Sequence, residues 1–525
     1  MKSKKYINAL LIFIFLSLFL KIDYRFIQEI GCCGDDHDYY MHAETIALDR
    51  DLDYENQFDG VEKVRFLFNE KKAPKGFIGS GLLAAPFLFL GESFNQVFKL
   101  ILGEEYKPIY NFKILFYSFS AIFYLFLSVY FTSKTLSTLN YRHNFYHLLL
   151  FYFGSGATYY AFERYSMSHI YEIFSVSVIL YLSAKYYFDS EKKIYPILIP
   201  IFILVALLVR WVNYFAFFLP VVIKIFSEKE GSKKIIFEKY FLLSSGVSLL
   251  IFCYLSIGVY GVLTFDPQFV YQNTYEVSGF LNELQNPILF VREKIMFFIY
   301  ILFSQEFGIF WFSPIIFAGL IISFKNFFMD VSKLSLIIPL MYLQVFAIVV
   351  VWNSTASSYG YRYLFSLVPV SVILMYDYHQ KNKILFNYVF YFSIFAAISL
   401  LFFETTELTS LRENVNVFGS LERFSQPEYL TGYIKSFTNI QGYLKIFTTS
   451  FLGASIFKVI LFFTGIPNLN EILLRYNLPV ANQDFQDYLI DLKEIHFASF
   501  IVSNIFIVLI VIFIIRFKRR EEVFN

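Results

Sequence analysis

The sequence predicts an all-α polytopic membrane protein of about 12 transmembrane helices, with juxtamembrane helices in its outer loops. Of its 525 residues, 57% are hydrophobic and 16% are charged, against about 25% charged residues in soluble domains. The mean hydropathy is +0.54. Apolar runs of helix-spanning length recur along the chain. They are continuous rather than alternating, which favours helices over a barrel.

The predicted spans are the apolar runs between polar or basic loops, and the first is interpreted as a retained anchor. We place them at residues 6–22, 109–132, 144–162, 170–188, 195–210, 212–226, 240–262, 307–324, 334–351, 362–378, 384–402 and 497–516.

Lys and Arg concentrate in short loops, which are expected on the cytoplasmic side of a membrane. These loops are at residues 2–5, 134–142, 185–193, 224–239, 325–333, 381–383 and 516–520. Both termini are therefore predicted to be cytoplasmic.

Three further apolar segments conflict with this orientation if they cross the membrane. Counting 77–103 as a span would move every later basic loop outside, so we expect it to lie on or dip into the outer leaflet. The same argument applies to 292–304 and 443–463. The outer pieces are then 23–108, 163–169, 263–306 and 403–496. We divide the chain into a transmembrane module, 1–402, and a C-terminal outer segment with the last helix, 403–525.

An acidic cluster follows the first apolar run. Asp35, Asp36 and Asp38 fall within four residues, next to Tyr39. Adjacent carboxylates repel each other, which raises one pKa and suits a general base. The alternative is that they cap a helix whose apolar face carries Tyr40 and Ala43, and otherwise face solvent.

Several other polar residues are predicted to reach the same outer boundary. Each has a structural alternative: a snorkelling lysine, a local Glu-Arg ion pair, a helix cap or a lipid-facing cation. An arginine at an outer helix end departs from the positive-inside trend and indicates an anionic partner, for which a phosphate suits its planar fork. The candidates are Lys75, Glu163, His169, Arg210, Asn213 and Arg362.

The pattern Asp35-Asp36-His37-Asp38-Tyr39 resembles the acidic motif that follows the first helix of C-type membrane glycosyltransferases (GT-C). That group includes the protein O-mannosyltransferases and the lipid A aminoarabinose transferases. Further similar segments are 49–56, Pro74-Lys75-Gly76 with 85–87, 166–169, 308–314 and 358–362. The similarity covers about residues 1–400, and 403–496 match no segment of the group.

The resemblance implies a bacterial plasma-membrane enzyme that transfers a sugar from a polyprenyl-phosphate donor to an acceptor hydroxyl on the extracytoplasmic face. Asp35 would be the base, and Asp36 would support it or bind the acceptor. Glu163 would match a second acidic position. The acceptor is a lipid, a glycan or a protein. No cofactor is implied with certainty, although a divalent cation is used by part of the group.

Two other classes of function stay open. A lipid-linked saccharide flippase should show ionisable groups within its helices and broken helices. A surface-polysaccharide polymerase or ligase would explain the long outer segment 403–496, but not the early acidic cluster. Nucleic-acid binding is not expected, because no basic patch occurs outside short loops. Nucleotide-binding and zinc motifs do not occur in a fitting context.

Overall fold

The computed structural model describes part of the chain, in separate segments. They are residues 2–20, 34–58, 66–104, 112–162, 164–188, 192–226, 235–265, 269–270, 286–304, 308–329, 336–352, 360–379, 383–403, 450–475 and short pieces between 490 and 516. Glu163 and most of the predicted outer segment 403–496 lie outside them.

The structure is built mainly of helices, as predicted. The α-helices of the described segments are α1 (Lys2–Leu20), α2 (Gly34–Glu44), α3 (Gly79–Leu102), α4 (Phe112–Thr138), α5 (Phe145–Phe153), α6 (Ala157–Phe162), α7 (His169–Phe188), α8 (Ile194–Val209), α9 (Leu219–Phe226), α10 (Lys239–Tyr260), α13 (Pro287–Phe303), α14 (Ile309–Phe312), α15 (Pro314–Met329), α16 (Ile337–Trp352), α17 (Val368–His379), α18 (Lys383–Phe403) and α23 (Phe451–Arg475). Shorter 3-10 and π elements are η2 (Thr45–Asp49), η3 (Asn56–Phe58), η4 (Trp211–Phe218), η5 (Ile235–Phe237) and η6 (Arg362–Leu367).

Several predicted single helices are broken. The run 144–162 is two helices, because the peptide around Gly154 and Gly156 leaves the α-helical path between α5 and α6. The run 212–226 begins as the 3-10 helix η4, and 362–378 begins as the 3-10 helix η6. By contrast, 77–103 forms one helix of 24 residues, α3, in spite of Pro86.

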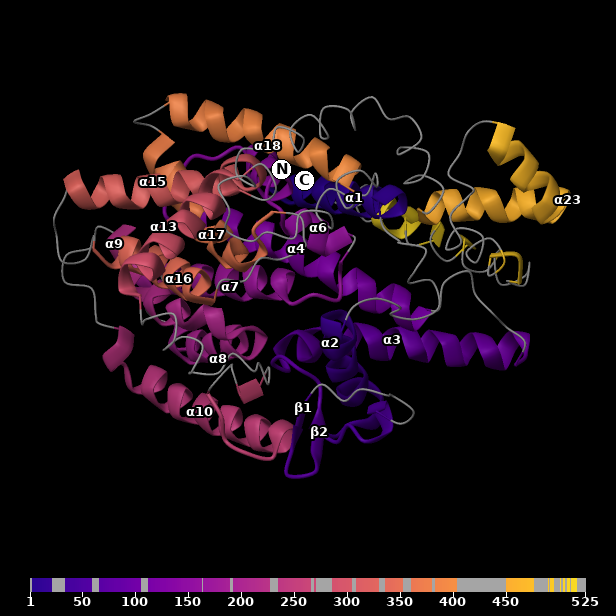
Figure 1. Cartoon of the computed structure of the whole chain (residues 1–525), viewed down its shortest axis with the longest axis horizontal. Coiled ribbons are helices and arrows are strands. Elements are labelled where there is room, and N and C mark those ends of the chain that lie inside the picture. The colour runs from indigo at the N-terminus through magenta and orange to yellow at the C-terminus, as the bar shows by residue number, and fades with distance from the viewer. Residues whose placement is uncertain are drawn as a thin grey trace.

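Helix α7 lies at the centre of the bundle (Figure 1). Almost every one of its residues is buried, and it packs against α4, α8, α9 and η6. Helix α10 runs along one edge of the molecule and packs mainly on α8, while α18 runs along the opposite edge (Figure 1). The polar residues at the start of α7 are therefore enclosed by several elements.

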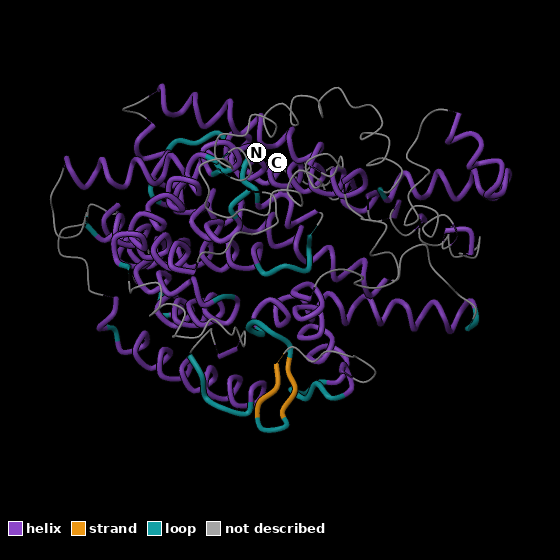
Figure 2. Tube along the Cα trace, in the orientation of Figure 1, coloured by secondary structure: helices purple, strands orange, loops and turns teal. Residues whose placement is uncertain are grey.

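A two-stranded antiparallel hairpin lies beside α2 and α10 (Figure 2). Strand β1 (Phe66–Phe68) pairs with β2 (Lys71–Ala73), with Leu67 opposite Lys72. The hairpin leads directly into the turn at 74–78 and then into α3. It thereby brings Lys75 next to the helix that carries the acidic cluster.

Two helices in the described part of the chain, α4 and α10, are long and apolar enough to cross a membrane. Shorter apolar helices include α8, α15, α16 and α18. Helix α10 exposes large apolar side chains along its outer side, among them Leu242, Leu250 and Tyr254, each more than half exposed.

Candidate functional site

The acidic cluster begins helix α2. Asp35 and Asp36 occupy its first turn, where the positive end of the helix dipole favours carboxylates. Their surroundings differ, because Asp35 is partly exposed whereas the side chain of Asp36 is 1% exposed. Asp38 and Tyr39 are also buried. The two neighbouring carboxylates are thus suited to different tasks.

Asp36 forms a buried ion pair with Arg164, from the loop between α6 and α7. The Ser166 hydroxyl donates to the Asp36 backbone carbonyl at 2.6 Å, which attaches the same loop to α2. Burial raises the pKa of Asp36, although Arg164 opposes the shift. Burial lowers the pKa of Arg164, but the attraction of Asp36, the hydrogen bond to it and the nearby Tyr159 and Tyr160 together outweigh burial and raise this pKa. In the described part of the chain, the partner of Arg164 is therefore Asp36. Its sequence neighbour Glu163, the local partner considered from the sequence, lies outside the described residues.

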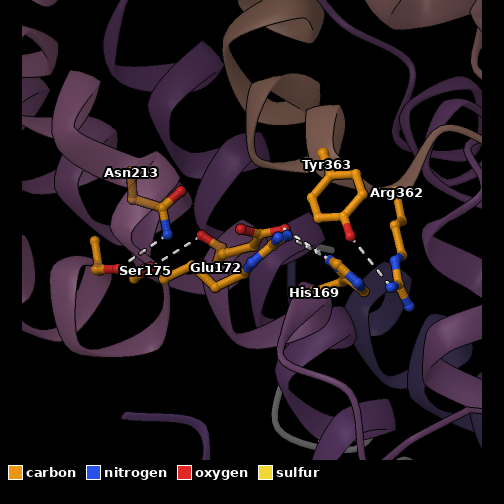
Figure 3. Close-up of polar contacts among 8 residues, drawn as sticks. His169, Glu172, Ser175, Asn213, Arg362 and Tyr363 are labelled. Carbon is orange, nitrogen blue, oxygen red and sulfur yellow. Dashed lines mark hydrogen bonds and ion pairs between the residues drawn. The ribbon is translucent and has the colours of Figure 1, made fainter. Parts of the chain in front are cut away.

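A second buried ionic group forms at the start of α7. The Glu172 carboxylate is fully buried, and its Oε1 atom lies 3.0 Å from His169 Nδ1 and 3.4 Å from an Arg210 guanidinium nitrogen. Arg210 ends α8 in an extended conformation (φ −159°, ψ 138°), which turns its side chain toward α7. Figure 3 shows Glu172 and His169 facing each other within this group.

Tyr363 joins this group to Arg362. The Arg210 guanidinium carbon lies 4.7 Å from the Tyr363 ring centroid, and that of Arg362 lies 5.2 Å from it. An Arg362 guanidinium NH2 group also donates to the Tyr363 hydroxyl at 3.3 Å (Figure 3). Within the described segments, Arg362 Nε has no hydrogen-bond partner. Two cations held against one aromatic ring favour an anion nearby.

Electrostatic interactions connect these parts into one polar cluster. Arg362 attracts both Asp35 and Asp36, and it acts on His169 together with Arg164. We use "polar cluster" below for Asp35, Asp36, Arg164, His169, Glu172, Arg210, Arg362 and Tyr363. They come from α2, the α6–α7 loop, α7, the end of α8 and η6. Of the predicted residues, Asp35, Asp36, His169, Arg210 and Arg362 are brought together.

The other predicted residues have different positions. Lys75 lies half-buried in the turn after β2, and Tyr39 lies on the buried side of α2. Asn213 is fully buried and donates to the Ala206 carbonyl at 2.9 Å, so it caps the end of α8, and its side chain also interacts with Glu172 at the edge of the polar cluster. Glu163 lies outside the described residues.

Glu172 was missed by the sequence reasoning. It lies within the predicted span 170–188. An ionisable residue inside a predicted membrane span is itself a signal of function. Its spacing of three residues from His169 on a helix would have placed both side chains on one face.

An apolar cavity of about 330 Å³ lies between α8, η4 and α10. It is lined on one side by Trp211 and Tyr214, directly after Arg210, and on another by Phe252 of α10 and Phe77. An apolar chamber therefore lies beside the cationic end of α8. No group of three or more His, Cys, Asp or Glu side chains suited to a metal occurs within the described segments.

Comparisons of the chain with family models, with curated proteins and with solved structures find no match.

Proposed function

We propose that the protein is an integral membrane glycosyltransferase that transfers a sugar from a polyprenyl-phosphate donor to an acceptor hydroxyl on the outer face of the membrane. The observation that carries this proposal is that a partly exposed carboxylate, Asp35, lies in one polar cluster with Arg362, beside an apolar cavity. An anionic head with a long apolar tail matches these two surroundings.

The membrane setting is supported by α10. Its apolar outer side is largely exposed, and soluble monomers rarely expose contiguous apolar patches larger than a few hundred Å². Together with α4 and the shorter apolar helices, it fits a chain that crosses the bilayer several times. The positive-inside trend of the loops supports an extracytoplasmic position for the polar cluster.

In the proposed reaction, different residues transfer the proton and stabilise the leaving phosphate. Asp35 takes the proton of the acceptor hydroxyl while the oxygen of that hydroxyl bonds to the anomeric carbon of the sugar. The bond from that carbon to the phosphate oxygen breaks, and polyprenyl phosphate leaves with the electron pair. Arg362 stabilises the charge on that phosphate, and Lys75, which lies outside the polar cluster but whose turn is bound to α2 through Gly76 and His42, is proposed as the second cation. A general base contributes about 10²–10⁴-fold, and one charge-stabilising donor about 10²–10³-fold.

Asp36, Glu172 and Arg210 hold the site in place. Asp36 is occupied by Arg164, so it anchors the loop before α7. Glu172 holds Arg210 and His169, and Arg210 in turn supports the Tyr363 ring against which Arg362 lies. Each of these residues acts on the reaction through a neighbour.

The test is transfer in cells and in nanodiscs. A deletion strain is complemented with the wild type, Asp35→Asn or Asp53→Asn, and its surface glycoconjugates are compared by mass spectrometry. Asp53 is the matched control, because its side chain is 61% exposed and pairs with Lys71 away from the polar cluster. We expect Asp35→Asn to lose the glycan that the wild type restores, while Asp53→Asn keeps it. Wild-type transfer by folded Asp35→Asn would refute the catalytic role.

A lipid-linked saccharide flippase is the second candidate. The observation that favours it is that helices are interrupted beside charged residues, at the buried Arg210 and at the partly buried Arg362. A flippase moves the lipid-linked sugar without consuming it. In nanodiscs containing donor and acceptor, release of free polyprenyl phosphate indicates the transferase. Movement of intact donor across proteoliposomes, without its consumption, indicates the flippase.

A further inference from the structure

One backbone oxygen joins three parts of the proposed site. The Gly76 carbonyl accepts a hydrogen bond from the Tyr260 hydroxyl and lies 3.2 Å from His42 Nε2. His42 is on α2, which begins with Asp35 and Asp36, and Tyr260 is the last residue of α10. A carbonyl oxygen has two lone pairs, so these two donors fill its capacity.

The protonation of the His42 ring follows from its partners. A carbonyl can only accept, so Nε2 carries the proton, and in the neutral ring Nδ1 is then an acceptor. The Tyr54 hydroxyl, 2.7 Å from Nδ1, must donate to it. His42 and Tyr54 are both fully buried. The imidazole is therefore held at both nitrogens and keeps one orientation.

These hydrogen bonds act on the turn that carries Lys75. Pro74 fixes the backbone before Lys75, and Gly76 adopts a φ of +87°, which favours glycine. With the Gly76 carbonyl bound by His42 and Tyr260, the backbone on both sides of Lys75 is constrained. A surface lysine ordinarily has no such restraint.

We propose that His42 is a positioning residue that orients Lys75 toward the phosphate of the lipid-linked substrate, an inference that rests on the proposed function for the identity of that ligand. His42 does this by fixing the turn at 74–76 against α2. Tyr260 adds α10, which forms a wall of the apolar cavity, to the same anchor. The turn that carries Lys75, the helix that carries the carboxylates and the helix that lines the cavity are therefore all connected through the Gly76 carbonyl.

The first experiment measures the turn itself and needs no activity. The protein in nanodiscs is acetylated briefly with an N-hydroxysuccinimide ester, and the modification of Lys75 is quantified by mass spectrometry relative to Lys72. The variants are His42→Phe, His42→Gln and Tyr260→Phe. The control is His147→Phe on α5, a half-buried histidine that packs against Phe386 and Phe390.

We expect His42→Phe and Tyr260→Phe to change Lys75 acetylation severalfold. The amide of His42→Gln can still donate to the Gly76 carbonyl, so this variant should stay near the wild-type value, as should His147→Phe. If His42→Phe fails to fold, Tyr260→Phe tests the same anchor by removing one hydroxyl. Unchanged Lys75 acetylation in folded His42→Phe, or in Tyr260→Phe where His42→Phe does not fold, overturns the proposal.

The second experiment connects the anchor to the ligand. Binding of undecaprenyl phosphate is measured for the wild type, Lys75→Ala, His42→Phe and the double variant. Because His42 acts through Lys75, each single variant should weaken binding about tenfold, the loss of one charge-assisted hydrogen bond, and the double variant should lose no more. Additive losses, or normal binding by His42→Phe when Lys75→Ala is impaired, contradict the positioning role. If the wild type does not bind undecaprenyl phosphate, the proposed function fails, whereas the acetylation result still decides whether His42 orients the turn.

Discussion

Replacing Arg164 by leucine should destabilise the fold strongly, because it leaves Asp36 buried without its cation. The Asp36 side chain is 1% exposed and that of Arg164 is 15% exposed. Breaking a buried ion pair from one side costs about 3–5 kcal/mol. The partial exposure of Arg164 puts the expected loss near the lower end, about 3 kcal/mol. Arg164 also opposes the burial that raises the pKa of Asp36, so its removal should raise that pKa further.

The assay is equilibrium unfolding in mixed detergent micelles, with Lys72→Leu as the control. Lys72 pairs with Glu55 at 2.7 Å, but their side chains are 36% and 54% exposed, so this loss should be about 0–1 kcal/mol. The double variant Asp36→Leu with Arg164→Leu removes both charges, and it should be less destabilised than the sum of the single variants. Equal losses for Arg164→Leu and Lys72→Leu, or strict additivity in the double variant, would refute the reasoning.

Three further predictions concern the surroundings of the polar cluster. Glu172→Gln leaves the Arg210 guanidinium without its buried anion, so transfer and stability should both fall, the latter by about 3–5 kcal/mol in the same unfolding assay. Burial lowers the pKa of His42 from 6.5 to about 4. Between these two pH values the unfolded chain binds a proton at His42 and the folded chain does not, so the free energy of unfolding falls as the pH drops from 6.5 to about 4. Unfolding at pH 7.5 and 4.5 should show less acid destabilisation for His42→Gln than for the wild type, and an unchanged pH dependence would contradict this. A Cβ on Gly79 would lie 2.5 Å from a backbone nitrogen of α8, so Gly79→Ala should lower the unfolding midpoint, whereas Gly246→Ala in α10, with nothing within 4 Å, should not lower it.

The positions of most helices could be predicted from the sequence, because long apolar runs leave few alternatives to helix in a chain of this composition. The runs at 170–188, 195–210 and 240–262 correspond to α7, α8 and α10 within two residues at each end. The breaks within other runs were not predicted. The hydrophobic pattern of an apolar run is the same whether its helix is continuous or interrupted, as it is between α5 and α6. Tertiary packing decides whether the helix is interrupted.

The candidate site was predicted only in outline. Placing polar residues at the ends of apolar runs found Asp35, Arg210 and Arg362, because such ends meet at one level of a helical bundle. The pairing of Asp36 with Arg164, 128 positions apart, depends on how α2 packs against the loop before α7, and no local pattern encodes that distance. The roles of these residues in transfer stay a proposal that the experiments above address.

The position of the apolar cavity determines from which side a long hydrocarbon can arrive. Phe217 and Leu249 line this chamber and are 55% and 54% exposed, so it opens onto the same flank along which α10 presents its apolar side chains. In a bilayer that flank adjoins the acyl chains. If the proposed donor is correct, its polyprenyl tail would reach the chamber by sideways diffusion within one leaflet, without crossing water, and its headgroup alone would remain at the aqueous boundary.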